Sequence, residues 1–171
     1  MFDPARTKLT IGSLDDDQLT VRAQYNPKEI DLAKQAGWKD FDKINGRLPA
    51  SQHDIVDLEY TGSAARTMSL ELLFDGYEER KSIEASVRAL QRMASPRDED
   101  SRDPAMLRPH LCVVAWGSTD FANFRCVIES IAVKYTAFSE AGAALRAVCQ
   151  VKLKEARLRR ELPGVIRYLT E

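Results

Sequence analysis

Residues 124–156, with the sequence FRCVIESIAVKYTAFSEAGAALRAVCQVKLKEA, decide the fold. Two stretches of this segment, 124–138 and 145–154, alternate apolar with polar residues, and a short turn at 139–142 separates them. A period of two is typical of strands that bury one face, and a short turn joins antiparallel neighbours. The segment therefore predicts a β-hairpin. In its second stretch one face carries Leu145, Ala147, Cys149, Val151 and Leu153, and the other carries Arg146, Gln150, Lys152 and Lys154.

Further strands and one helix are predicted outside this hairpin. The period changes to a helical one over about 79–94, which predicts an amphipathic helix packed on the sheet, with an apolar stripe of Ile83, Val87, Leu90 and Ala94. The fold class is therefore mainly β with one α-helix. Alternation or short apolar runs predict strands at 8–14, 19–25, 55–62, 67–75 and 110–117.

Three consecutive aspartates, Asp15, Asp16 and Asp17, separate the first two predicted strands. Aspartate favours turns, so we expect a β-hairpin whose turn is solvated. A calcium loop would need spaced carboxylates and a distant glutamate, which this segment does not supply. The sequence therefore predicts a turn and no metal site here.

Composition and charge exclude several classes of partner. In the 171-residue chain, 25 Lys and Arg residues nearly balance 26 Asp and Glu residues, so no global field attracts nucleic acid or an anionic membrane. The opening MFDPARTKLT is unlike a signal peptide, and no apolar run approaches the roughly 18 residues of a membrane span. Cys112, Cys126 and Cys149 lack a metal-binding spacing and are expected to be reduced core thiols. We expect a single domain that folds in the cytosol.

No pattern typical of a catalytic, cofactor or metal site occurs in the sequence. It contains no GxSxG, P-loop or GxGxxG motif, and its two histidines, His53 and His110, are expected in a loop or at a strand edge. Glu71 and Glu129 could form an acid–base pair on neighbouring strands, but carboxylates are common on the wet face of a sheet. The prediction is a protein that is not an enzyme and binds no cofactor.

Three segments resemble a known family: AQYNPKEIDLAKQAGWK (23–39), MSLELLFDGYEE (68–79) and the hairpin segment 124–156. They are similar to the tube-domain proteins of contractile injection systems, the phage-tail-derived particles that drive a rigid tube through a target envelope. The resemblance covers about residues 6–156 in the family's order and spacing. The matching positions are Gln24, Tyr25, Asn26, Pro27, Glu29, Trp38, Phe74, Asp75, Tyr77, Glu78, Trp116, Gly117, Glu129, Ser130, Tyr135, Thr136, Phe138, Gly142 and Arg146.

The resemblance also has departures. Ala144 stands where the family usually has proline, and the LysM module that many members carry is not found in this sequence, so no LysM-mediated contact is expected. The resemblance implies two antiparallel sheets that close as a tail-tube-like barrel or sandwich with one helix outside. It divides the chain into a tube-like β domain, residues 1–156, and a C-terminal docking segment, residues 157–171.

The function implied by the resemblance is structural. It is a subunit of a six-fold ring, at the junction of the inner tube and the spike hub in the baseplate. The expected partners are further copies of the chain, the spike hub protein, the inner tube protein and baseplate wedge proteins. Assembly would take place in the cytoplasm, before the phage-tail-like particle is released. The alternative from a different class is a small β-barrel that binds single-stranded nucleic acid, for which Lys152, Lys154 and Tyr135 would have to supply the groove.

Two sets of residues are predicted to serve assembly. Asn26-Pro27 interrupts a ladder because proline cannot donate, so the chain is expected to leave one sheet and extend toward a neighbour, with Trp38 as an apolar anchor; an ordinary bulge with a core tryptophan is the alternative. Residues 39–54 lack a regular period and are expected to order only on assembly. The predicted subunit contacts are Trp38, Phe41, Ile44 and Leu48, and the predicted lumen-facing residues are Arg146, Gln150, Lys152 and Lys154.

Overall fold

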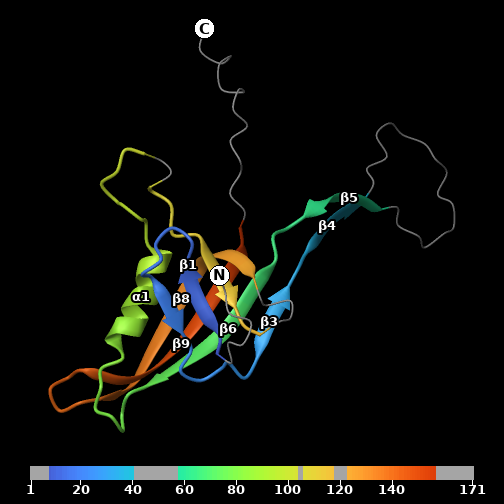
Figure 1. Ribbon diagram of the computed structural model, residues 1–171. Helices are drawn as coiled ribbons and strands as arrows, with labels where there is room; N and C mark the ends of the chain where they lie inside the picture. The colour runs from blue at the N-terminus through green and yellow to red at the C-terminus, as the bar shows by residue number, and fades with distance from the viewer. Residues whose placement is uncertain (1–7, 41–57, 104–105, 118–122, 157–171) are drawn as a thin grey trace, which may run out of the picture.

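The computed structural model describes residues 8–40, 58–103, 106–117 and 123–156 (Figure 1). Within these residues, seven strands form one antiparallel sheet in the order β2-β1-β7-β8-β9-β6-β3, and β4 pairs with β5 as a two-stranded ribbon. The mainly β class with one helix is confirmed. The elements are β1 (Thr10–Ser13), β2 (Thr20–Arg22), β3 (Ile30–Ala33), β4 (Ala36–Asp40), β5 (Leu58–Ser63), β6 (Thr67–Asp75), α1 (Glu84–Ala94), β7 (Cys112–Ala115), β8 (Phe124–Phe138) and β9 (Ala144–Glu155).

The β8–β9 hairpin lies at the centre of the sheet. β9 pairs with β8 along almost its whole length, and its other edge pairs with β6 from Thr67↔Lys154 to Asp75↔Arg146. In the turn between β8 and β9, Gly142 has φ +83, a left-handed conformation that glycine adopts at little cost. The predicted antiparallel hairpin is therefore confirmed, and the alternation along β9 is matched by its burial.

One face of the curled sheet is buried. Strands β1 and β2 lie over β6 and β9 in Figure 1, and α1 covers part of the same face, so the arrangement is sandwich-like. The two antiparallel sheets and the single packed helix agree with the prediction, but no closed barrel forms among the described residues, because β2 and β3 remain edge strands. The shared core includes Leu9, Ile11, Val21, Met68, Leu72, Val87, Leu90, Met93, Cys149, Val151 and Leu153.

The helix begins at Glu84, later than the predicted residue 79, because a tight turn precedes it. The N–H of Lys81 donates to the carbonyl of Gly76 at 3.0 Å, and the N–H of Gly76 donates to the carbonyl of Leu145 at 2.8 Å. A Cβ atom at position 76 would lie 2.0 Å from the Lys81 carbonyl oxygen, so only glycine fits there. Within the helix, the buried face is Val87, Leu90 and Met93.

The connection through Asn26-Pro27 stays within the main sheet. It carries the chain from edge strand β2 to β3, which pairs with β6 at the opposite edge. The expectation that the chain leaves the sheet at Pro27 was therefore wrong; the departure comes later, at β4. The paired strand β2 ends at Arg22, earlier than the predicted break at Asn26-Pro27, and the side-chain oxygen of Asn26 accepts the N–H of Leu9 at 3.0 Å.

Asp15 is the centre of a second set of contacts, the Asp15 cluster. Its carboxylate accepts two hydrogen bonds from Arg108, at 2.8 and 2.9 Å, and one from the N–H of Leu111 at 2.8 Å. Arg97 lies 3.5 Å away. These contacts, led by the Arg108 hydrogen bonds, lower the pKa of Asp15 to about 2, although burial opposes the shift. The expectation that the aspartate turn is simply solvated was wrong for Asp15, which ties the β1–β2 turn to the chain before β7.

Asp15→Asn should lower the free energy of unfolding at neutral pH by about 2 kcal/mol, the equivalent of a pKa lowered from 3.8 to about 2. Because the folded pKa is depressed, this stabilisation is complete above the ordinary pKa and is lost as the pH falls from about 4 to about 2. Urea unfolding of both proteins across this range measures it. Asp17→Asn, a change to an exposed neighbour, is the control. A stability difference between wild type and Asp15→Asn that stays constant down to pH 2 would contradict the assignment.

Candidate assembly surfaces

The β4–β5 ribbon projects from the main sheet (Figure 1) and exposes large apolar side chains. Trp38 and Tyr60 are cross-strand partners with ring centroids 5.2 Å apart, and Leu58 lies two residues from Tyr60 on the same face. Trp38, Tyr60 and Leu58 are 58%, 52% and 56% exposed, respectively. The alternative in which Trp38 belongs to the core of this chain was therefore wrong. We call these three side chains the ribbon's apolar face.

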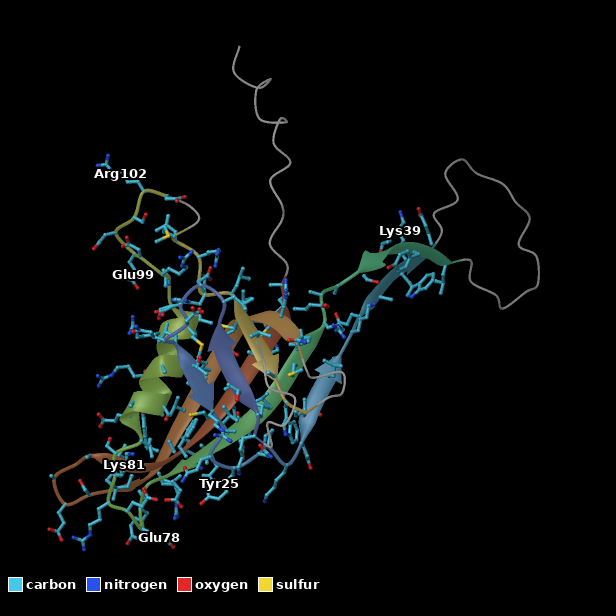
Figure 2. The ribbon with its side chains drawn as sticks, in the orientation of Figure 1. Tyr25, Lys39, Glu78, Lys81, Glu99 and Arg102 are labelled. Carbon is cyan, nitrogen blue, oxygen red and sulfur yellow. The ribbon has the colours of Figure 1, made fainter. Side chains whose placement is uncertain are left out.

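The opposite face of the ribbon is polar. Lys39 and Glu59 are cross-strand partners joined by an ion pair of 3.0 Å, and Figure 2 shows Lys39 far out on the ribbon. The register skips Thr61, so β5 carries a bulge, and a Cβ at Gly37 would lie 2.5 Å from the Thr61 hydroxyl oxygen. The ribbon thus has an apolar side and a polar side. Two-stranded ribbons are only marginally stable alone in water.

Of the predicted contact residues, only Trp38 can be placed. Phe41, Ile44 and Leu48 lie outside the described residues. The irregular segment predicted over 39–54 was wrong at its start, because Lys39 and Asp40 belong to β4. Leu58 and Tyr60 were not identified from the sequence. The alternation in 55–62 places Leu58 and Tyr60 on one face of a strand. Alternation alone, however, does not say whether that face is covered by the rest of the chain.

The predicted lumen residues share the outward face of β9 but differ in how far they are exposed. Gln150, Lys152 and Lys154 are exposed, whereas Arg146 is half-buried. Glu129 on β8 lies 3.2 Å from the Lys152 ammonium and 3.6 Å from that of Lys154, and the hydrogen bond with Lys152 is the largest cause that lowers its pKa. Glu129 is thus held ionised between two lysines, which is the opposite of what a general acid needs.

Gln24 forms a link between the β2–β3 connection and the end of β6. Its side-chain amide donates to the carbonyl of Asp75 at 2.6 Å, and its side-chain oxygen accepts the N–H of Asp75 at 2.7 Å. The side-chain amide of Gln24 therefore bonds the main chain of Asp75 in the way that a residue of a neighbouring strand would. This pair of hydrogen bonds joins the chain just after edge strand β2 to strand β6, which lies next to the opposite edge of the curled sheet.

Arg146 joins the same group of contacts. Its guanidinium donates to the Asp75 carboxylate at 2.7 Å and lies over the ring of Tyr77, 5.7 Å from the centroid, while the N–H of Tyr77 donates to the same carboxylate at 3.0 Å. The hydrogen bond from Arg146 is the main cause that lowers the pKa of Asp75. We call Gln24, Asp75, Tyr77 and Arg146 the Gln24–Arg146 cluster.

His110 is buried beside the Asp15 cluster, before the start of β7. Its Nδ1 lies 2.9 Å from the hydroxyl oxygen of Ser13, which also accepts the N–H groups of Asp15 and Asp16 at 3.0 Å each. Since those two N–H groups occupy the oxygen, the hydroxyl hydrogen points to the imidazole. Burial is the largest cause that lowers the pKa of His110. The pair fixes the β1–β2 turn, and His53 lies outside the described residues.

Residues 8–40, 58–103, 106–117 and 123–156 contain no group of three or more His, Cys, Asp or Glu side chains placed to hold a metal ion. In the same part of the chain, no helix is long and apolar enough to cross a membrane. The three cysteines are all buried free thiols, as expected.

The chain matches the model of the contractile injection system tube protein family over residues 5–162. The chain belongs to this family. The matched range contains every residue that the structure describes. No curated protein matches the chain significantly. This match confirms the family resemblance inferred from the sequence motifs. A tube protein is a structural component of a phage-tail-like particle.

In this tube protein, motif positions that lie far apart in the sequence meet in the Gln24–Arg146 cluster. Gln24 comes from the first motif, Asp75 and Tyr77 from the second, and Arg146 from the third. The sequence could identify each position by resemblance, but the contacts between them depend on how the sheet curls. Two other motif residues, Tyr135 and Phe138, lie side by side near the end of β8, with ring centroids 6.3 Å apart.

Gln24→Ala should lower the tube protein's free energy of unfolding by about 1 kcal/mol, because it removes both hydrogen bonds to the Asp75 main chain. Gln24→Glu should cost at least as much, since a carboxylate cannot donate to the Asp75 carbonyl. The control is Gln150→Ala, which changes an exposed glutamine on β9. Urea unfolding measures all three. Equal stability of Gln24→Ala and Gln150→Ala would refute the structural role of Gln24.

Proposed function

We propose that this tube-family protein forms a six-fold ring at the junction of the inner tube and the spike hub in the baseplate. The observation that carries the proposal is the exposed apolar face of the ribbon, Trp38, Tyr60 and Leu58. Three large apolar side chains on a projecting two-stranded ribbon favour a partner surface, because covering each one fully would contribute about 1.5–3 kcal/mol.

The edges of the main sheet supply a second argument for self-association. Within the described residues, the outer edges of β2 and β3 have no partner strand. Unpaired edges expose rows of N–H and C=O groups, which another strand can satisfy. A heterologous contact that uses two different edges closes into a ring when its rotation is an integral fraction of a turn. Copies of this chain joined edge to edge would then form the ring, and six copies is the number that the family resemblance implies.

The ribbon and the segment after it would then reach a neighbouring subunit or layer. In this proposal Trp38 contacts the neighbour, and Phe41, Ile44 and Leu48 continue the contact beyond β4. The ribbon's apolar face can be buried only by a partner, since the main sheet covers neither Trp38 nor Tyr60. This is the arrangement expected for a joint between subunits rather than for part of one core.

The outward face of β9 is the proposed lining of the ring's lumen. Arg146, Gln150, Lys152 and Lys154 lie on that face, and an apolar bore would adhere to passing cargo. Glu129 lies within ion-pair distance of both lysines and offsets one of their two positive charges, which leaves the face polar without a strong field of one sign. The same pairing argues against the nucleic-acid alternative, since a binding groove would need lysines available for phosphates.

The spike hub and the inner tube would lie on the two sides of the ring, with baseplate wedge proteins around it, and residues 157–171 would form a docking segment beside the β domain of residues 1–156. Assembly would take place in the cytoplasm, before the particle is released. A ring of this kind needs no catalytic group and no cofactor, and we propose no enzymatic activity for the chain.

A double change on the ribbon tests the proposal. Trp38→Ala with Tyr60→Ala should reduce ring formation at least tenfold, while the melting temperature of the protomer stays nearly unchanged, because both side chains are exposed in the single chain. Lys39→Ala with Glu59→Ala alters the opposite face of the same ribbon and is the matched control. Mass photometry, alone and with a spike hub protein, measures assembly. A monomer that never assembles with itself, hub or tube would rule out the ring.

Truncation after Ala156 tests the docking segment. The shortened chain should keep the melting temperature of the full chain, because the described core ends within β9. Its incorporation into particles should fall by at least tenfold, as judged by negative-stain microscopy and by immunoblotting of purified particles. Normal incorporation would show that residues 157–171 are not needed for docking, while leaving the ring proposal intact.

A further inference from the structure

Cys112 and Cys126 face each other across strands β7 and β8. They are direct register partners, and both are fully buried. Directly opposed residues of an antiparallel pair project from the same face of the sheet, so the two thiols are neighbours within the core. Neither residue takes part in the ribbon, the polar face or the clusters described above.

The backbone defines how closely the two cysteines approach. The N–H of Leu14 donates to the carbonyl of Leu111 at 2.7 Å, so the peptide groups of Leu111 face β1. Because peptide groups alternate in direction along a strand, the N–H and C=O of Cys112 point toward β8. On β8, the carbonyl of Arg125 accepts the N–H of Ala156 at 3.2 Å, so the peptide groups of Arg125 face β9. The N–H and C=O of the next residue, Cys126, therefore point toward β7. The cysteines therefore form a hydrogen-bonded pair.

A pair of this type fits a disulfide with some strain. Its Cα atoms lie about 5.5 Å apart, which is close to the commonest separation in disulfides. Its Cβ atoms must approach by roughly 1 Å more than an ordinary cross-strand pair requires. Strained disulfides are the more easily reduced ones, so the bond would form and break reversibly.

We propose that Cys112 and Cys126 are a disulfide-forming pair, which a small-molecule disulfide oxidises to an intramolecular cross-link between β7 and β8. One cysteine thiolate attacks the small molecule, forms a mixed disulfide and releases one thiolate. The other cysteine thiolate then attacks the protein sulfur of the mixed disulfide and expels the second. The two cysteine protons end on the two released thiols, so the pair loses two electrons and the oxidant gains two. The proposal does not rest on the ring function.

Oxidation requires the core around β7 to open. Burial raises the pKa of Cys112 to about 12 and raises that of Cys126 as well, so neither thiolate is populated in the folded chain at neutral pH. The pair should therefore react during folding or local unfolding, when both thiols regain ordinary acidity and access. Once closed, the 112–126 loop restricts the unfolded chain and lowers the unfolding constant, by about a hundredfold for a loop of this length.

Cys149 is an internal control. It lies on β9 opposite Val133, which is seven residues from Cys126 along β8, or about 23 Å at the usual rise of a strand. All three thiols are buried in the same core, but only Cys112 and Cys126 are register partners. A reaction that depends on burial alone would treat the three alike, whereas one that depends on pairing would not.

The test is refolding of the full chain from urea with oxidised glutathione, followed by alkylation, trypsin digestion and mass spectrometry. Trypsin separates the cysteines into the peptides 103–125, 126–134 and 147–152. The expected product is 103–125 joined to 126–134, with 147–152 alkylated. Dithiothreitol should release the link and lower the melting temperature by about 5–10 °C. Cys149→Ala should retain the link, and Cys126→Ala should lose both the link and the dithiothreitol effect.

Three results would overturn the proposal. They are three free thiols after refolding with the oxidant, glutathione adducts on 103–125 and 126–134 without a link between them, and a link that includes 147–152. Because the first readout uses the wild-type chain, it remains decisive even if a cysteine variant fails to fold. Adding the same oxidant to the folded chain gives the second readout: cross-linking should be slow and should accelerate with sub-denaturing urea. A rate that urea does not change would contradict the need for opening.

Discussion

The pairing of β9 with both of its neighbours is the interaction on which the rest of the structure depends. β9 joins β8 on one side and β6 on the other, and its inward residues Cys149, Val151 and Leu153 are at the centre of the shared core. A slip of one residue would turn Lys152 and Lys154 into that core and expose the apolar row. The register of this one strand therefore fixes which face of the sheet receives α1 and which face stays polar.

Two polar clusters hold opposite ends of this sheet. In Figure 2, Tyr25 and Glu78 mark the end near the Gln24–Arg146 cluster, and Glu99 marks the loop region near the Asp15 cluster. Each cluster ties a connection to a strand by charge-assisted or main-chain hydrogen bonds, which are stronger than ordinary surface ion pairs when the geometry is close. The sheet can thus remain open at β2 and β3 without losing its curl.

The ribbon follows a different physical rule from the sheet. The main sheet satisfies its apolar side chains within the chain, whereas Trp38, Tyr60 and Leu58 are left half or more exposed. A two-stranded ribbon gains too little from its own pairing to be stable alone, so burial by a neighbour would add to its stability as well as to assembly. This coupling between local order and association would suit the proposed ring, since its joints would become firm only where subunits meet.

The sequence by itself determined the class, the hairpin and the family. Alternation along β9 predicted its buried and polar faces, and motif residues such as Gln24, Asp75 and Arg146 indicated the family, because period and motif spacing are local properties of the chain. Only the tertiary structure decided that those motif residues touch, that Asp15 is a tied group rather than a solvated one, that Trp38 is uncovered, and that Cys112 lies opposite Cys126. These features depend on register, on the curl of the sheet and on what lies across it, and no local pattern encodes the distance between segments that are far apart in sequence.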